Sequence, residues 1–478
     1  MGTYTIPAGA SFLTALGRGI LDLSQEQSIP LPEFRILLPH RRACRELQEI
    51  FLDLSEGKPL LLPQIHPIGE VDEDELSLIA DEDLAAKILE IPPSISPMRR
   101  QFLLMRLVQK VEYGRTGHEI APDHALRLAR ALAQFMDQVI LEDLSYDRLD
   151  QIVPAEFAEH WGITVEFLKI LSDVWPQILS ENNLIEAAER RNKLLRLQAE
   201  HWKNTNPEYP IIAAGSTGTM KATSDLMGVI HTLPHGMVVL PGLDTELDRT
   251  SWDAIEASHP QKTMQELLNE LSIERTHIQI WRGAEQSSSA GRRFLVREIM
   301  RPAATAEEWQ NISPEVITSH KMDSVLNDIR RIDCETLDQE AKVIALKLRE
   351  VSETPGRTAA LVTPDRVLAR QVQQICKRWN IELDDTAGSP LSNTALGRFI
   401  SLSLDVLREG YRPSILLALL KHPLCGYGYS KADIEIDIKE LERPQKLRGA
   451  LPKDMRSILA PTKFGTFLDT QEKQLKTL

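Results

Sequence analysis

The sequence predicts an α/β protein built on a parallel sheet, and three observations carry that prediction. Short strand-like runs alternate with amphipathic helical patterns near the beginning of the chain and again beyond residue 331. Some of these runs, such as FRILLP, are apolar enough to lie inside a parallel sheet. Between the two alternating regions, residues 76–204 carry helical patterns only. We therefore expect one α/β domain with an all-helical insertion, followed by part of a second α/β domain.

The first domain begins with two strand–helix pairs. TYTI predicts a first strand, and SFLTALGRGILDL predicts a helix with an apolar stripe from Phe12 to Leu23. FRILLP, residues 34–39, predicts a buried strand that runs directly into the helical pattern HRRACRELQEIFLDL. The next stretch, KPLLLPQIHPIGEV, is extended and interrupted by prolines. These elements give residues 1–75 as the first part of the domain.

The insertion begins after a strongly acidic segment, GEVDEDELSLIADED. Its helical patterns are MRRQFLLMRLVQKVEYG, HALRLARALAQFMDQVILEDL, EFAEHWGITVEFLKILSDVWPQIL and NNLIEAAERRNKLLRLQAEHW. Strand-like runs return at YPIIAAG and GMVVLPGLD, so residues 205–330 continue the first domain. The insertion, at residues 76–204, is long enough to form a domain of its own.

The second domain is expected at residues 331–478, after a polar linker. LDQEAKVIALKLREV, DRVLARQVQQICKRW and TALGRFISLSLDVLREG predict helices, and TAALVTP and IELDD predict the strands between them. This alternation implies a parallel sheet with helices on its faces. The last fifty residues contain no further strand pattern, so we expect this domain to be incomplete.

Composition and charge exclude several classes of protein. The formal net charge of −14 argues against a protein that grips nucleic acid over its whole surface, although a local basic track remains compatible with it. The four cysteines are far apart and form no CxxC pair, so neither a disulfide framework nor a zinc site is expected. No apolar run approaches the roughly 20 residues that a membrane span requires, and we predict a cytoplasmic location.

Two glycine-containing turns lie where a nucleotide phosphate would bind. In PIIAAGSTGTMKATSDL a strand, a small-residue turn and a helix follow one another, but Lys221 follows Met220 rather than glycine, and Ala222 replaces the expected hydroxyl. In IPAGAS the turn keeps Gly9 but has no lysine, since the first lysine of the chain is Lys58. Both turns are therefore degenerate phosphate loops or ordinary tight turns.

The run GMVVLPGLD has the form of a strand that ends in a magnesium-binding acid. Pro241 and Gly242 interrupt it before Asp244, which favours a turn-capping role for this carboxylate. Gly9 and Asp244 are therefore the candidate residues of a degenerate nucleotide site. We identify no catalytic residue: Asp333, Glu340 and Lys342 have the types of a nuclease set but fall in a helical pattern.

Six residues are candidates for contact with nucleic-acid phosphates, because each lies where a helix begins after a strand. They are Arg41, Arg42, Ser216, Thr217, Thr219 and Arg366. In VTPDRVLAR we expect Thr363 to cap the helix and Pro364 to occupy its first position. A solvated helix face is the alternative explanation for the arginines.

Seven segments in order resemble the AddB subunit of the AddAB helicase–nucleases, in its alphaproteobacterial form. They are LLPHRRACRELQEIF, LLPQIHPIGEVDEDEL, AAGSTGTMKATSDLM, VVLPGLD, AALVTPDRVLARQV, RWNIELDDTAGSPLSNT and LLALLKHPLCGYG, and they span essentially the whole chain. The resemblance implies two RecA-like domains, of superfamily-one helicase type, with a helical insertion in the first. It also implies an AddA motor subunit and DNA ends as partners, no membrane, and a role in the repair of double-strand breaks by recombination.

The chain departs from the functional motifs of that family. No lysine stands near Gly9, the acid pair of the second helicase motif is reduced to Asp244, and Thr363 and Pro364 replace an expected arginine. These departures predict an inactivated helicase. The family's nuclease residues, magnesium and iron–sulphur cysteines would lie beyond Leu478, so we expect this chain alone to have neither nuclease activity nor a cofactor. Two alternatives remain, an active ATP-dependent helicase subunit and a partner-binding scaffold without DNA contact.

Overall fold

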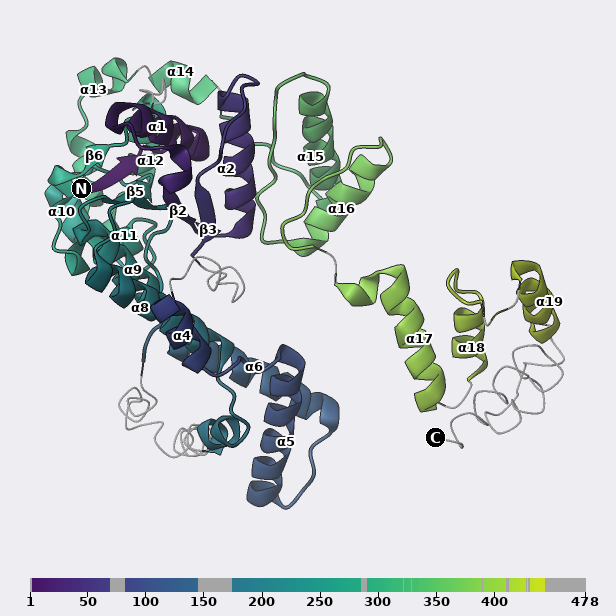
Figure 1. Ribbon diagram of the computed structural model, residues 1–478. Helices are drawn as coiled ribbons and strands as arrows, with labels where there is room; N and C mark the ends of the chain where they lie inside the picture. Colours follow the sequence, from purple (N-terminus) through teal and green to yellow (C-terminus); the bar gives the residue numbers. More distant parts are fainter. Residues whose placement is uncertain are drawn as a thin grey trace. The chain divides into compact units, whose positions relative to one another are not determined.

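The computed structural model describes most of the chain. The described residues are 2–68, 82–144, 174–284, 290–320, 322–327, 329–388, 390–409, 412–426, 428 and 430–442. The chain divides after Arg330 into two compact units, residues 1–330 and 331–478, and each is described by itself (Figure 1). Among the described residues, no helix combines the length and the apolar character needed to cross a membrane.

The first unit is built on a six-stranded, all-parallel sheet, which confirms the predicted α/β class. The strand order is β3-β2-β4-β5-β1-β6. The strands are β1 (Gly2–Ile6), β2 (Arg35–Leu38), β3 (Gln64–Pro67), β4 (Ile211–Ala214), β5 (Gly236–Pro241) and β6 (Gln279–Ile280). The first strand therefore lies inside the sheet, between β5 and β6.

The two strands that the sequence pattern did not reveal are the edges of the sheet. β3 lies in the proline-interrupted stretch and ends at Pro67, and β6 has only two residues. Short edge strands and edge prolines are common because an edge needs only one hydrogen-bonded neighbour. Neither strand has the length or the apolar run from which the inner strands could be predicted.

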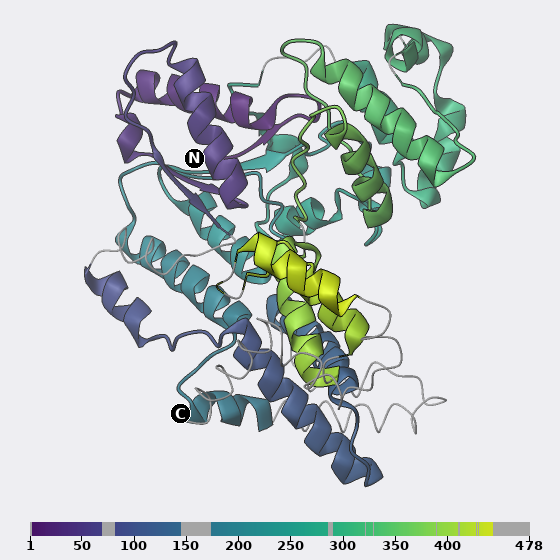
Figure 2. The same ribbon diagram turned by 90° about the vertical axis from the view of Figure 1, so that its right-hand side faces the viewer.

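Both faces of the sheet are covered by helices (Figures 1 and 2). Along β4 alternate side chains point to opposite faces, with Ile211 and Ala213 in one apolar cluster and Ile212 and Ala214 in the other. The first cluster includes side chains of α8 (Ala187–Thr205), α9 (Lys221–Thr232) and α11 (Lys262–Glu270). The second includes those of α1 (Phe12–Gln27) and α2 (Arg41–Leu54).

Between residues 82 and 205 every regular element that the structure describes is a helix. Before α8 come α4 (Glu82–Glu90), α5 (Pro97–Thr116) and α6 (Pro122–Leu141). Ion pairs join α5 to its neighbours: Arg100 of α5 lies 2.9 Å from a carboxylate oxygen of Asp137 in α6 and 2.9 Å from one of Glu186, the residue just before α8. The helix pattern predicted at 156–179 falls largely outside the described residues, which resume at 174.

The second unit contains the predicted helices but not the predicted strands. Its helices are α15 (Leu337–Ser352), α16 (Arg366–Lys377), α17 (Ala395–Glu409), α18 (Pro413–Leu420) and α19 (Lys431–Leu441). The TAALVTP and IELDD segments are not strands, so the prediction of a paired sheet is wrong for the described residues. The physical reason is the lack of a ladder partner: Val362, in the middle of the first segment, is 93% exposed.

Candidate functional site

A crevice of the first unit lies at the carboxyl ends of β1 and β5. The chain leaves β1 through α1 toward β2 on one side, whereas it leaves β5 through α11 toward β6 on the other side of β1. Because these two connections run in opposite directions, the neighbouring strand ends form a topological switch point. Ligands of open α/β sheets bind in crevices of this kind.

The crevice has a volume of about 320 Å³ and is enclosed by four parts of the unit. These are the turn after β1, the loop after β5, residues 259–261, and helix α12 (Ala290–Ile299) with β6 beside it. The structure thus places the predicted pair Gly9 and Asp244 around one crevice. Their positions agree with a former nucleotide site, but the details of the two loops do not favour hydrolysis.

The turn after β1 retains the bend of a phosphate loop without its cation. Gly9 adopts a φ of 90°, a left-handed conformation that favours glycine. The residues that line the crevice, all of them in the described part of the chain, include no lysine. A phosphate in this turn would therefore lack the cation that normally reaches the β and γ oxygens.

The carboxylate of Asp244 is used to shape its own loop. Its Oδ1 accepts hydrogen bonds from the amides of Glu246 and Leu247, each at 2.9 Å, which confirms the expected turn-capping role. The Asp244 amide donates to Oε1 of Gln261 at 3.0 Å. One oxygen of this carboxylate therefore holds the loop after β5.

Helix α12 brings to the crevice three arginines that the sequence reasoning missed. Arg292, Arg293 and Arg297 line it, and Arg297 forms an ion pair with Glu246 at 2.8 Å. The local signal was the basic run GRRFLVREIMR, but nothing in its helical spacing indicates that it meets β1, almost 300 residues earlier. Only the strand order, with β6 next to β1, brings the two together.

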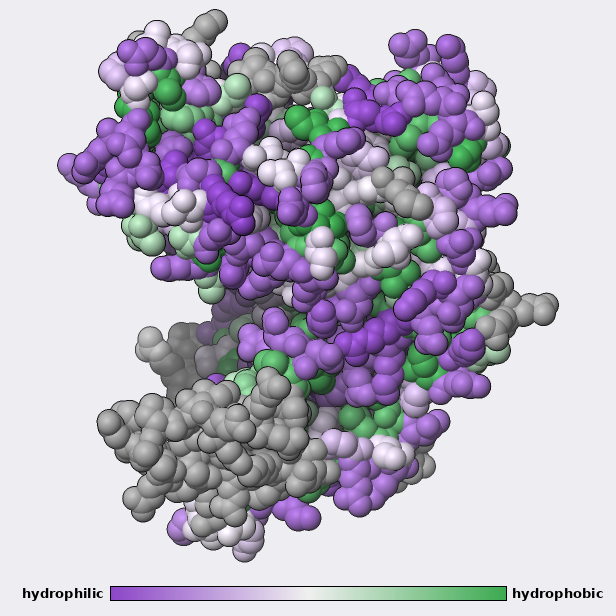
Figure 3. Space-filling view, turned by 90° about the vertical axis from the view of Figure 1, so that its left-hand side faces the viewer, coloured by the Kyte–Doolittle hydropathy of each residue, from purple (hydrophilic) through white to green (hydrophobic). Residues whose placement is uncertain are grey.

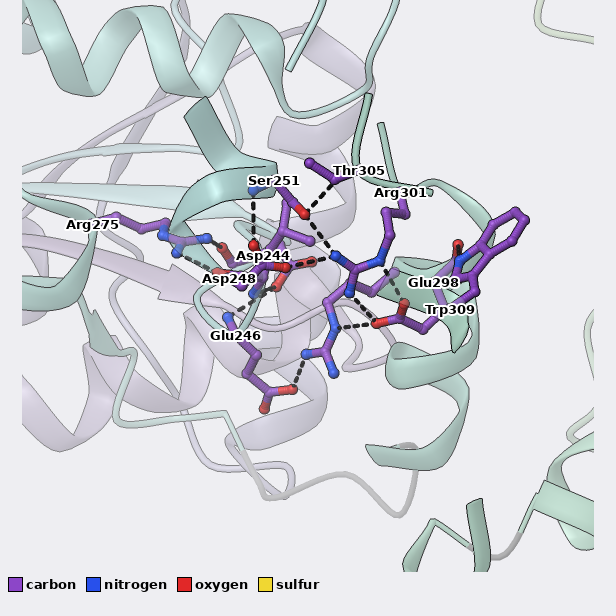
Figure 4. A network of polar contacts seen from close by, with 11 residues as sticks. Asp244, Glu246, Asp248, Ser251, Arg275, Glu298, Arg301, Thr305 and Trp309 are labelled. Atoms are coloured by element: carbon purple, nitrogen blue, oxygen red, sulfur yellow. Dashed lines mark hydrogen bonds and ion pairs between the residues drawn. The ribbon is translucent and has the colours of Figure 1, made fainter. Parts of the chain in front are cut away.

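A polar network fixes the loop after β5 to α12 and the chain beyond it (Figure 4). Arg301 donates to Asp248 at 2.6 Å and to Glu298 at 2.8 Å. Burial works to raise the pKa of Asp248, but the Ser251 amide and the Arg301 guanidinium outweigh it and hold that pKa at about 2. On the other side of the loop, Arg275 donates to the backbone carbonyl of Asp244 at 3.0 Å.

A second group of candidates lies farther along the same edge, where β2 and β4 end. A Cβ placed on Gly215 would lie 3.4 Å from Pro39, so the loops after the two strands are in contact. Ser216, Thr217 and Thr219 line the loop after β4, where the two threonine hydroxyls are 2.9 Å apart. The turn that carries these hydroxyls therefore begins beside Pro39, two residues before α2.

Arg41 and Arg42 are the first two residues of α2, and both are exposed. The helix is capped by His40, whose Nδ1 accepts a hydrogen bond from the Ala43 amide at 3.1 Å. Because the amides of a first helical turn and two guanidinium groups occupy this end, it carries positive charge on an acidic protein. Five of the six candidate phosphate contacts therefore lie at one part of the sheet edge.

The lysine of the β4–α9 turn is not directed at a phosphate. Lys221 Nζ lies 3.0 Å from a carboxylate oxygen of Glu270 and 3.3 Å from one of Asp225. The hydrogen bond with Glu270, followed by the charge of Asp225, raises the pKa of Lys221. The charge that a phosphate loop would use is thus balanced by two acids of the protein.

The sixth candidate, Arg366, lies in the second unit and has an acidic partner. Its Nη1 and Nη2 donate to the two carboxylate oxygens of Asp385 at 3.0 and 2.6 Å. The prediction that Thr363 caps α16 is wrong: Asp365 accepts hydrogen bonds from the amides of Val367 and Leu368 instead. A carboxylate caps a helix more favourably than a threonine hydroxyl because its negative charge interacts with the positive end of the helix dipole.

No group of three or more histidine, cysteine or acidic side chains that could hold a metal ion occurs within the described ranges. Comparison of the chain with protein-family models and with curated protein sequences gives no match. A functional proposal therefore rests on the geometry of the β1–β5 crevice and of the β2–β4 edge.

Proposed function

We propose that this protein is a helicase-like scaffold that guides DNA in double-strand break repair and does not hydrolyse ATP. In this proposal it pairs with an AddA-type motor subunit in the cytoplasm, within a helicase–nuclease complex. The observation that supports it most directly is the presence, at the β2–β4 edge, of the exposed Arg41, Arg42 and Thr219 and the half-buried Ser216 and Thr217. The sequence resemblance supplies the biological context.

The β2–β4 edge has the chemistry of a backbone-binding site. Arginine side chains, small hydroxyls and helix N-termini are the groups that proteins place against phosphates without reading sequence. Arg41 and Arg42 are exposed at the beginning of α2, and Thr217 and Thr219 lie on the neighbouring loop. A single strand that follows the carboxyl edge would meet these groups in succession.

The β1–β5 crevice supports the lack of hydrolysis. Its turn has no lysine, Asp244 is engaged by the amides of its own loop, and Arg297 is paired with Glu246. Phosphoryl transfer requires cations and a magnesium ligand to stabilise the charge of the transferred group. The crevice therefore supports a protein that has the fold of a helicase domain but does not hydrolyse ATP.

Binding of a fluorescent single-stranded oligonucleotide over a range of salt concentrations tests the proposal. We expect the double variant Arg41→Ala/Arg42→Ala to bind about tenfold more weakly near 0.1 M salt. The slope of the logarithm of the binding constant against the logarithm of the salt concentration should become shallower by about two. The matched control is Arg127→Ala/Arg130→Ala, which removes two exposed charges from α6. Equal affinity of the two variants, or no DNA binding at low salt, would contradict the proposal.

A partner-binding scaffold without DNA contact is the second candidate, and one observation favours it. Helix α17 exposes an apolar stripe at helical spacing, formed by Leu396, Ile400, Leu404 and Leu407, which are 53%, 44%, 59% and 74% exposed. Stripes of this kind mark helix-docking surfaces. If the oligonucleotide does not bind while an Ile400→Asp/Leu404→Asp variant loses a co-expressed AddA-type subunit, this second function replaces the first.

A further inference from the structure

The wall of the crevice formed by α12, together with the helix η5 (Ala303–Asn311) that follows it and does not itself line the crevice, is not anchored in the core of the sheet. Neither of the two apolar clusters on the sheet faces includes a residue of α12. The large apolar side chain that α12 buries, Phe294, stacks instead on His320, with ring centroids 4.3 Å apart. This wall therefore packs against the chain that follows it.

Polar contacts between described residues join this wall to the rest of the crevice, and Figure 4 shows those around Arg301. Arg297 pairs with Glu246 at 2.8 Å, and Arg301 pairs with Asp248 at 2.6 Å and donates to the Ser251 hydroxyl at 2.6 Å. Further contacts are Ser251 to Thr305, with 2.8 Å between hydroxyl oxygens, and His259 Nε2 to the Met300 carbonyl at 2.9 Å. Their partners lie in the loop after β5 or in the segment just beyond it.

The apolar side chains of α12 that face the crevice are not packed. Val296 and Met300 line it and remain 52% and 40% exposed, and the neighbouring Ile299 is 62% exposed. On the face of the molecule that Figure 3 shows, hydrophobic residues are scattered among hydrophilic ones. Displacement of α12 would therefore cost little apolar burial against the sheet.

Two of the contacts that hold the wall are ion pairs whose acids are half-exposed. Glu246 and Asp248 are 56% and 45% exposed, and ion pairs with half-exposed partners stabilise much less than buried apolar side chains. By contrast, α1 and α9 each place several large apolar side chains in the sheet clusters. Elements held by polar contacts, with few apolar side chains in the core, are those that open locally while the fold persists.

We propose that α12 and η5 form a displaceable lid over the β1–β5 crevice, and that Arg301 is its latch. In the closed state Arg301 links Glu298 at the end of α12 to Asp248 and Ser251 at the start of α10 (Arg249–Asp253). Release of this link, with that of Arg297 from Glu246, separates the lid from the loop after β5. The sheet and the helices on its two faces remain in place.

Hydrogen–deuterium exchange of the intact chain, followed by peptide, tests the lid. We expect amides of residues 291–299 to exchange at least about a hundredfold more slowly than free amides, yet about a hundredfold faster than those of α9. Glu246→Gln and Thr305→Val should each accelerate exchange in α12 about five- to tenfold and leave α1 and α9 unchanged.

A matched control is Glu26→Gln, which removes the carboxylate that pairs with Arg282, another exposed ion pair of the same unit. It should leave exchange in α12 unchanged. The proposal is overturned if α12 exchanges at the rate of α9, or if Glu246→Gln and Thr305→Val accelerate exchange equally in every helix. Either result would show that α12 opens only when the whole unit unfolds.

Labelling of a thiol in the crevice gives a second, independent measurement. Leu247 lines the crevice and is 3% exposed, so the thiol of a Leu247→Cys variant should react slowly with iodoacetamide. Adding Thr305→Val should raise the labelling rate of that peptide about five- to tenfold. An unchanged rate would show that the lid does not control access to the crevice.

Discussion

The β1–β5 crevice and the β2–β4 edge lie at the carboxyl ends of the same parallel sheet, but their arginines differ in exposure. In the crevice, Arg297 is 14% exposed and pairs with Glu246. At the β2–β4 edge, Arg41 and Arg42 lie in the first turn of α2 and are exposed. The difference teaches that a turn with the bend of a phosphate loop and an exposed basic surface can lie at separate places on one sheet edge.

The largest effect should come from the latch of the crevice. Arg301→Met removes the guanidinium that binds both Asp248 and Glu298, and Glu298, which is 8% exposed, keeps the longer contact with Arg297 at 3.4 Å. Breaking a mostly buried ion pair in this way should lower the free energy of unfolding by about 3 kcal/mol. Urea denaturation measures it, and Arg249→Met, at a 95% exposed side chain, should change stability by less than about 0.5 kcal/mol. Equal effects would contradict a latch at Arg301.

The next effect tests the packing of the β2–β4 edge. Gly215 and Gly57 both have a φ of 78°, but a Cβ on Gly215 would lie 3.2 Å from Phe12, whereas one on Gly57 would meet nothing within 4 Å. Gly57→Ala should cost about 1 kcal/mol through backbone strain alone. Gly215→Ala should cost about 1 kcal/mol more, because Phe12 must also move. If thermal unfolding finds the same loss for both, Gly215 is not in tight contact with Phe12 of α1.

The pH dependence of Asp248 should have a smaller effect. Its folded pKa of about 2 is lower than that of a free aspartate, so its contribution to stability is present above about pH 4 and is lost as the pH falls through 2. Because this carboxylate is 45% exposed, we expect a contribution of only about 1 kcal/mol. Asp248→Asn should therefore be less stable than the wild type at pH 6, and the difference should shrink near pH 2. A difference that does not depend on pH would contradict this origin.

The smallest effect concerns Lys221 at the β2–β4 edge. Glu270→Gln removes one of the two acids that balance its charge, so binding of single-stranded DNA at low salt should strengthen about threefold. Glu266→Gln removes a charge from the same helix, but Glu266 pairs with Lys262 rather than with Lys221. The Glu266→Gln variant should therefore bind single-stranded DNA less tightly than the Glu270→Gln variant. If the two variants have the same affinity, Lys221 lies away from the path of the DNA.

The inner strands and the helices could be predicted from the sequence because the information is local. YPIIAAG forms a strand that is buried on both faces, whereas in FRILLP Ile36 and Leu38 are buried and Arg35 and Leu37 are half-buried. The same kind of reasoning failed for TAALVTP, because a strand also needs a neighbour, and the pattern does not show whether one is present. It also could not find the arginines of α12, whose place beside β1 depends on the strand order.

The candidate site was predictable in part for the same reason. Arg41 and the hydroxyls of residues 216–219 follow predicted strands directly, so their place at the carboxyl edge could be inferred. The partner of Arg366 could not, since Asp385 reaches it across a loop that carries no periodic pattern. A charge that looks available in the sequence is often balanced by an acid that only the fold brings near.

Photocrosslinking tests most directly whether anions bind at the β2–β4 edge rather than in the crevice. The chain would be crosslinked to a single-stranded oligonucleotide that carries photoreactive bases, and the modified peptides would be identified by mass spectrometry. The account predicts crosslinks in residues 39–46 and 215–221, reduced in Arg41→Ala/Arg42→Ala. Crosslinks confined to residues 242–247 and 290–300 would contradict it, because the DNA would then occupy the crevice.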